Sequence, residues 1–216
     1  MIYAENILIC IAIPLIVSLF FIHGNVRRYM GAFLTGMVMC LLSAYISSFL
    51  GGAFDVADNE TAVFLSPMVE ELMKLLPLML AMLLLGVEDT ALTTLAVAIG
   101  AGFATYENCC YILTSGAENL GYVLIRGLAV GVMHIVSILA LAIWFNLAKR
   151  LKVFTLSSVM IGVSIAMIFH SLYNLLVSRP GISTTIGFIM PIATAAGLFF
   201  IFGRLSRGSK ETIPNG

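Results

Sequence analysis

Long apolar segments alternate with short polar links along almost the whole chain. A helix that crosses a lipid bilayer needs roughly 20 mostly apolar residues. Segments of this kind lie at about residues 6–22, 30–50, 62–85, 91–113, 122–147, 153–177 and 183–203. The pattern predicts an all-α bundle of about seven transmembrane helices that forms one domain over residues 1–216, with no second domain, linker or repeat.

The first apolar segment is expected to remain as a transmembrane span rather than to be cleaved as a signal peptide. Glu5 is the only charged residue in front of it, so the basic region that opens a signal peptide is missing. No small-residue cleavage site follows Phe20, Phe21 and Ile22.

Composition supports a protein whose main solvent is lipid. The 216 residues are 61% hydrophobic and 10% charged, whereas soluble domains carry about 25% charged residues. The net charge of zero gives no electrostatic reason to expect nucleic acid binding. The four cysteines lack zinc-finger spacing and are expected to act as small apolar residues. They are Cys10, Cys40, Cys109 and Cys110.

The links between the predicted spans alternate in charge, which predicts the orientation of the chain. Lys and Arg collect on the cytoplasmic side of membrane proteins. One side holds eight basic residues: Arg27, Arg28, Lys149, Arg150, Lys152, Arg204, Arg207 and Lys210. The other side holds two basic residues and four acidic ones: Arg126, Arg179, Asp55, Asp58, Glu60 and Glu118. We therefore expect a multi-pass protein of the cell membrane with its N-terminus outside and its C-terminus in the cytoplasm, although the Glu88–Asp89 link falls on the inner side without a basic residue.

A few ionisable residues lie inside the predicted spans, where each is costly and marks a functional site by default. Counted from the span ends, all of them fall in the outer half of the bilayer, roughly 9 to 18 Å below the surface. They come from four different predicted helices: Glu70, Glu71, Lys74, Glu107, His134 and His170. Ionisable residues with unrelated roles would lie at different depths in the bilayer. Their common depth therefore predicts one shared site.

Spacing within the third span distinguishes its two carboxylates. Lys74 lies four residues after Glu70 and three after Glu71, so it can pair with either side chain on one helix face. Glu70 and Glu71 point about 100° apart around the helix. One of them can therefore bind Lys74 while the other faces a cavity. Ser66-Pro67 indicates either a helix start or a kink in this span.

Two further faces carry polar groups. His170 and Asn174 are four residues apart, with Tyr173 beside them, and Arg126 and His134 share a stripe of the fifth span. In that span Gly127 and Gly131 form a GxxxG pattern, which predicts close approach of a neighbouring helix.

This set of side chains can support hydrolysis by activated water. Glu70 with a nearby His134 can hold and deprotonate a water, and His170 with Asn174 can donate hydrogen bonds to an oxyanion. A metal-dependent version uses Glu70, Glu107, His134 and His170 as ligands of a divalent metal such as zinc, although no HExxH motif is present. Ser137, one turn from His134, is the nearest Ser–His pair. Each residue also has a structural reading: an ion pair, or a polar contact that joins helices.

Four segments resemble the motifs of PrsW intramembrane proteases. Val69–Lys74 resembles the EExxK motif, and Gly102–Asn108 resembles GFATxEN. His134, eight residues after Arg126, matches the third motif, and His170–Asn174 is similar to HxxYD/N. The motifs occur in family order over about residues 62–178. This chain has EExxK where relatives in the wider superfamily of CAAX prenyl proteases commonly have EExxxR.

The resemblance implies an intramembrane endopeptidase that makes the first, site-1 type cut in a single-span membrane protein such as an anti-sigma factor. It implies Glu70 as water activator, His134 as its partner and His170 with Asn174 at the oxyanion. Glu71 is counted with these catalytic residues, where it helps to shape the site. The supporting residues are Lys74, Glu107, Asn108, Tyr173 and Arg126. The metal-free version of this chemistry is our first expectation, with no cofactor.

Two other functions fit intramembrane Glu and His residues. A proton-coupled transporter uses such groups as a relay, but needs a polar path to both faces. A non-enzymatic immunity or scaffold protein of the same superfamily would keep the fold and bind without turnover.

Overall fold

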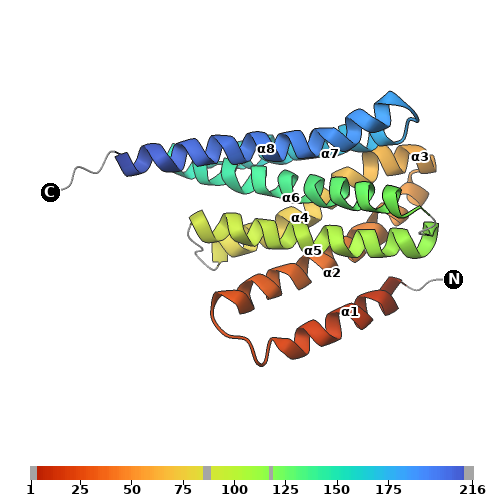
Figure 1. The fold of residues 1–216 in the computed structure, drawn as a ribbon, viewed down its shortest axis with the longest axis horizontal. Coiled ribbons are helices and arrows are strands. Elements are labelled where there is room, and N and C mark those ends of the chain that lie inside the picture. The colour runs from red at the N-terminus through yellow and green to blue at the C-terminus, as the bar shows by residue number, and fades with distance from the viewer. Residues whose placement is uncertain (1–3, 85–88, 117–118, 212–216) are drawn as a thin grey trace.

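The structure is a computed structural model, and it describes residues 4–84, 89–116 and 119–211, which form helices joined by short links (Figure 1). Glu88, Glu118 and the last residue of the predicted segment 62–85 lie outside these ranges. Successive long helices run in opposite directions along the long axis (Figure 1). The predicted all-α bundle is confirmed by the helices α1 (Ala4–Ser18), α2 (Asn25–Ala53), α3 (Asp58–Glu60), η1 (Thr61–Leu65), α4 (Ser66–Leu84), α5 (Asp89–Ser115), α6 (Leu120–Arg150), α7 (Leu156–Val177) and α8 (Ile182–Glu211).

The outside of the bundle is apolar. Large side chains such as Phe49, Ile168 and Phe199 are 72%, 67% and 83% exposed, as suits a surface in contact with lipid. By length and composition, α2, α6, α7 and the Ile182–Phe200 part of α8 can each cross a membrane. In α4 three ionisable side chains interrupt the apolar run. Polar groups inside and apolar groups outside define a multi-pass membrane protein.

The helix that carries the two carboxylates is continuous through α3, η1 and α4, and η1 within it is a π-helix. The N–H of Ser66 bonds to the carbonyl of Thr61, five residues earlier. Pro67 follows directly and has neither an N–H to donate nor room for the carbonyl four residues before it. A wider turn relieves that clash, so Ser66-Pro67 marks a local distortion inside a helix rather than a helix start.

Glycines let α5 and α2 lie against each other at short distance. A Cβ at Gly102 would lie 1.9 Å from the Phe33 carbonyl oxygen of α2, and one at Gly36 would lie 2.1 Å from the Ile99 oxygen. The GxxxG prediction was wrong, because a Cβ at Gly127 or Gly131 would meet nothing within 4 Å. The close contact therefore forms on α5, five residues before Glu107.

Three buried apolar clusters enclose the region where the predicted site residues meet. One joins α4, α5, α6 and α7 around Leu78, Ile138 and Phe145. A second joins α1, α2 and α5, and a third joins α6, α7 and α8 around Met133 and Tyr173. The polar residues lie between these clusters, so apolar packing fixes the helices that carry them.

Candidate active site

Lys74 lies at the centre of a buried polar network and has no exposed surface. Its Nζ lies 2.6 Å from Glu71 Oε1, 3.0 Å from Ser137 Oγ and 3.2 Å from His134 Nδ1. An ammonium group has three N–H donors, and each has one of these acceptors. The structure therefore selects the Glu71–Lys74 pair from the two that spacing allowed, and leaves Glu70 free of it.

His134 is held at both ring nitrogens. Because Nδ1 accepts from the ammonium of Lys74, the ring proton lies on Nε2, which donates to Glu107 Oε2. The other Glu107 oxygen lies 3.6 Å from Arg126. Arg126 in turn donates to Asn108 Oδ1 at 2.7 Å. A chain of polar contacts thus runs from Lys74 on α4 through His134 on α6 to Glu107 on α5, then back to Arg126 on α6 and on to Asn108 on α5.

His170 stands between the two carboxylates of α4. Its Nδ1 lies 2.8 Å from Glu71 Oε1 and donates to it, since a carboxylate can only accept. In a neutral ring this leaves the lone pair of Nε2 facing Glu70 Oε2 at 3.6 Å. That oxygen is buried and has no hydrogen-bond partner. Two acceptors face each other here, so a proton or a cation is needed between them.

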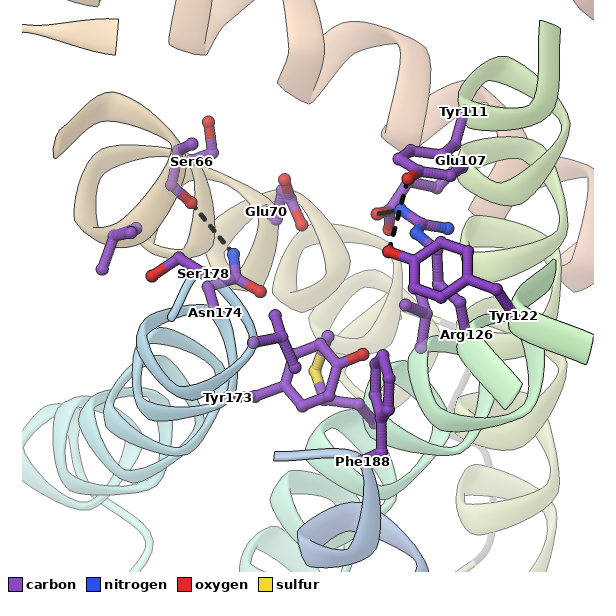
Figure 2. Close-up of a pocket in the computed structure, with 15 residues that line it drawn as sticks. Ser66, Glu70, Glu107, Tyr111, Tyr122, Arg126, Tyr173, Asn174, Ser178 and Phe188 are labelled. Atoms are coloured by element: carbon purple, nitrogen blue, oxygen red, sulfur yellow. Dashed lines mark hydrogen bonds and ion pairs between the residues drawn. The ribbon is translucent and has the colours of Figure 1, made fainter. Parts of the chain in front are cut away.

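Glu70 lies on the wall of a cavity of about 390 Å³ (Figure 2). Figure 2 shows its side chain across this space from Glu107 and Arg126 and above Tyr173. Asn174 lies on the same wall and donates its Nδ2 to the Ala62 carbonyl oxygen at 3.0 Å. Tyr173 is buried and its hydroxyl has no hydrogen-bond partner. Carboxylate, guanidinium, amide and phenol therefore all border one space that can admit a peptide bond.

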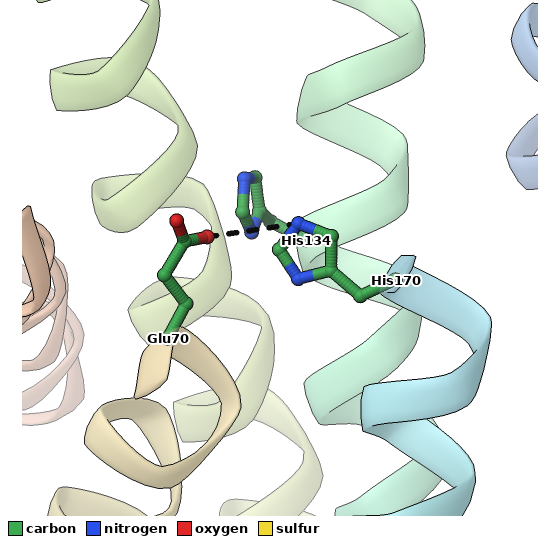
Figure 3. A group of neighbouring side chains, drawn as sticks. All are labelled: Glu70, His134 and His170. Carbon is green, nitrogen blue, oxygen red and sulfur yellow. Dashed lines mark ion pairs between the residues drawn. The ribbon is translucent and has the colours of Figure 1, made fainter. Parts of the chain in front are cut away.

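The three residues Glu70, His134 and His170 offer ligand atoms that all lie within 4.8 Å of one another (Figure 3). Ligand atoms on one tetrahedral zinc ion lie roughly 3.3 Å apart, close to the 3.6 Å between Glu70 and His170. Glu71 on the far nitrogen of His170 matches the carboxylate–histidine arrangement that orients metal ligands. Glu70 and the free Nε2 of His170 fit a divalent metal, and His134 can join them only when Lys74 or Glu107 releases one of its ring nitrogens. Glu107 is bound to His134 and does not belong to this group of three.

All the residues that the sequence singled out meet in this region. Glu70, Glu107, Arg126, Tyr173 and Asn174 line the cavity. The other predicted site residues are buried behind that lining: Glu71, Lys74, His134 and His170. Asn108 contacts Arg126. One relation differs from expectation, because the imidazole that pairs with Glu70 belongs to His170, while His134 is engaged by Lys74 and Glu107.

Sequence reasoning missed two tyrosines. The guanidinium of Arg126 lies 3.4 Å from the centre of the Tyr111 ring, and the hydroxyls of Tyr111 and Tyr122 lie 3.4 Å apart. Tyr111 is four residues after Glu107, and Tyr122 is four before Arg126. This spacing places each tyrosine on the face of a recognised residue and could have revealed both.

A multi-pass helical bundle with a buried Glu/His site beside a cavity is the arrangement expected of an intramembrane hydrolase. The family model described as "PrsW family intramembrane metalloprotease" matches residues 25–202, and the chain belongs to this family. No curated protein and no solved structure matches it. The chain is accordingly an intramembrane peptidase whose substrate is a membrane protein.

Proposed function

We propose that this peptidase makes a site-1 type cut in a single-span membrane protein, such as an anti-sigma factor, near the extracytoplasmic face. The observation that carries the proposal is the meeting of Glu70, His134 and His170 at the wall of a cavity. The excess of basic residues on the links opposite this end supports the orientation.

Hydrolysis in this arrangement starts with a water held at Glu70. Its oxygen attacks the peptide carbonyl carbon while Glu70 accepts its proton. Tyr173, whose hydroxyl has no other partner, donates a hydrogen bond to the oxyanion, and so does the Asn174 N–H that is not bound to the Ala62 carbonyl. The C–N bond then breaks, and Glu70 returns the proton to the leaving amine nitrogen. We assign the hydrogen bond to the oxyanion to Tyr173 in place of His170, because His170 faces Glu70 and Glu71.

The remaining polar residues position these groups. Glu71 fixes which nitrogen of His170 faces Glu70, and Lys74 fixes the ring of His134. Glu107 holds the other side of that ring and also faces Arg126.

A divalent metal would be held by Glu70 and His170, with His134 as a third ligand once Lys74 or Glu107 releases one of its ring nitrogens, and it would supply Lewis-acid activation of the water and the carbonyl. The family description names a metalloprotease. Glu71 then keeps His170 in the tautomer that presents Nε2.

Substitution of Glu70 tests the proposal. Glu70→Gln keeps the size of the side chain but removes its ability to accept a proton as a carboxylate. We expect cleavage of a co-expressed single-span reporter to fall by about 100-fold or more. Glu60→Gln is the matched control, since Glu60 is exposed and lies outside the cavity wall. Wild-type cleavage by a well-inserted Glu70→Gln variant would refute the assigned role.

Chelation separates the two versions of the chemistry. Purified protein in liposomes is treated with a membrane-permeable chelator, and reporter cleavage is measured before and after Zn²⁺ is restored. Loss and recovery of cleavage are expected for a bound metal. Activity that survives prolonged chelation, with no metal found by elemental analysis, would assign the whole activation of water to the protein's side chains.

A further inference from the structure

A second cavity meets the first at Glu70. It has a volume of about 610 Å³ and extends along the end of α2 and the following link. Ala62, Ser66 and Glu70 belong to the walls of both cavities. A peptide whose scissile bond lies at Glu70 can therefore extend into one cavity on one side and into the other cavity on the opposite side.

The lining of this α2 cavity is made of small and polar residues. Ser47 lines it and is 4% exposed, yet its hydroxyl has no hydrogen-bond partner, and neither has the buried hydroxyl oxygen of Thr61. Buried hydroxyls are normally hydrogen-bonded, so these two oxygens call for a polar partner. Both oxygens are covered in the present arrangement, and a rotation of the Ser47 or Thr61 side chain toward the cavity would let it hydrogen-bond to the main chain of an extended peptide.

Charge distinguishes the two cavities. Arg126 is the cation of the first cavity, and it is already engaged by Glu107, Asn108 and the Tyr111 ring. Asp55 and Asp58 line the α2 cavity, and among the described residues neither has an ion-pair partner. Unpaired charge is therefore negative and lies on one side of Glu70.

We propose that the α2 cavity is a substrate-binding subsite that takes the segment on one side of the scissile bond and favours a Lys or Arg side chain there. The inference rests on the proposed cleavage at Glu70. Ser47 and Thr61 hydrogen-bond to the peptide, and Asp55 with Asp58 bind the basic side chain.

The test uses purified protein in phosphatidylcholine liposomes and single-span reporters that carry Lys, Ala or Glu at one of ten positions around the cut. We expect Lys to raise kcat/KM about fivefold over Ala at one or two neighbouring positions on a single side of the cut, and Glu to lower it. Asp55→Asn combined with Asp58→Asn removes that Lys-over-Ala ratio. Glu60→Gln, an exposed acid outside both cavities, keeps it.

Two results would overturn the subsite. One is a Lys preference that survives the double substitution, and the other is an equal preference at every position, which indicates general surface attraction. If the wild-type protein cuts no reporter, the proposed function fails, and binding still tests the subsite. A fluorescent Ala/Ser decapeptide with one Lys is titrated against Glu70→Gln with and without the two Asp substitutions. About fivefold weaker binding supports the subsite, and equal affinity refutes it.

Discussion

Lys74 uses all three of its N–H groups on Glu71, Ser137 and His134, and therefore has no donor left for substrate. Its task is to neutralise a buried carboxylate and to orient an imidazole. This explains why one carboxylate of the adjacent pair remains available at the cavity wall. The division between Glu70 and Glu71 follows from their 100° separation around α4.

Removal of the Lys74 charge should cost more stability than removal of the whole pair. Lys74→Met leaves the Glu71 carboxylate buried without its cation, and we expect a loss of about 3–5 kcal/mol. Lys74→Met combined with Glu71→Gln leaves no unpaired charge and should lose less. Thermal unfolding in detergent measures both variants. A single variant as stable as the double variant would show that the pair does not carry this charge balance.

At the level of elements, α5 positions Glu107 through its contact with α2. The backbones approach at Gly36 and Gly102, where a methyl group would collide with a carbonyl oxygen rather than with a movable side chain. Small residues at such crossings replace the hydrophobic driving force that is absent between helices in lipid.

Gly102→Ala should therefore destabilise the bundle by about 1–3 kcal/mol, because α5 must move away from α2. Gly127→Ala is the matched control on α6, where the added methyl meets nothing within 4 Å. Unfolding temperature in detergent compares the two variants. Equal effects of the two substitutions would mean that the α2–α5 contact adapts freely.

The orientation of the whole molecule is a prediction from charge alone. Eight basic residues on one set of links should keep that side in the cytoplasm. A green fluorescent protein fused to the C-terminus should fluoresce, and alkaline phosphatase at the same place should be inactive. The reverse pattern would put the Glu70 cavity on the cytoplasmic side and exclude an extracytoplasmic cut.

Sequence periodicity predicted contacts between residues of one helix better than contacts between residues of different helices. The spans, the pairing of Lys74 with one of the two adjacent carboxylates and the common depth of the ionisable residues followed from apolar length and spacing. The partner of Glu70 did not, because the choice between His170 and His134 depends on how α4, α6 and α7 pack. For the same reason the glycine contact was assigned to α6 and not α5, and the α2 cavity with Ser47 was missed.

The π-helix η1 has a consequence for how the gene can vary. A π turn holds one residue more than the α turn it replaces, so loss of one residue would restore a regular helix and leave the segments on either side close to their present orientation. The Ala62 carbonyl lies inside this turn and accepts from Asn174, so restoring the α turn would shift that one contact. Deletion of Phe64 should therefore lower reporter cleavage without unfolding the bundle, whereas Phe64→Ala, which keeps the residue count and removes a half-exposed side chain, should leave cleavage unchanged. Homologues are thus expected to differ by one residue within 61–65, but not in the regular helix that follows, where an indel would turn Glu70 by about 100° away from its cavity.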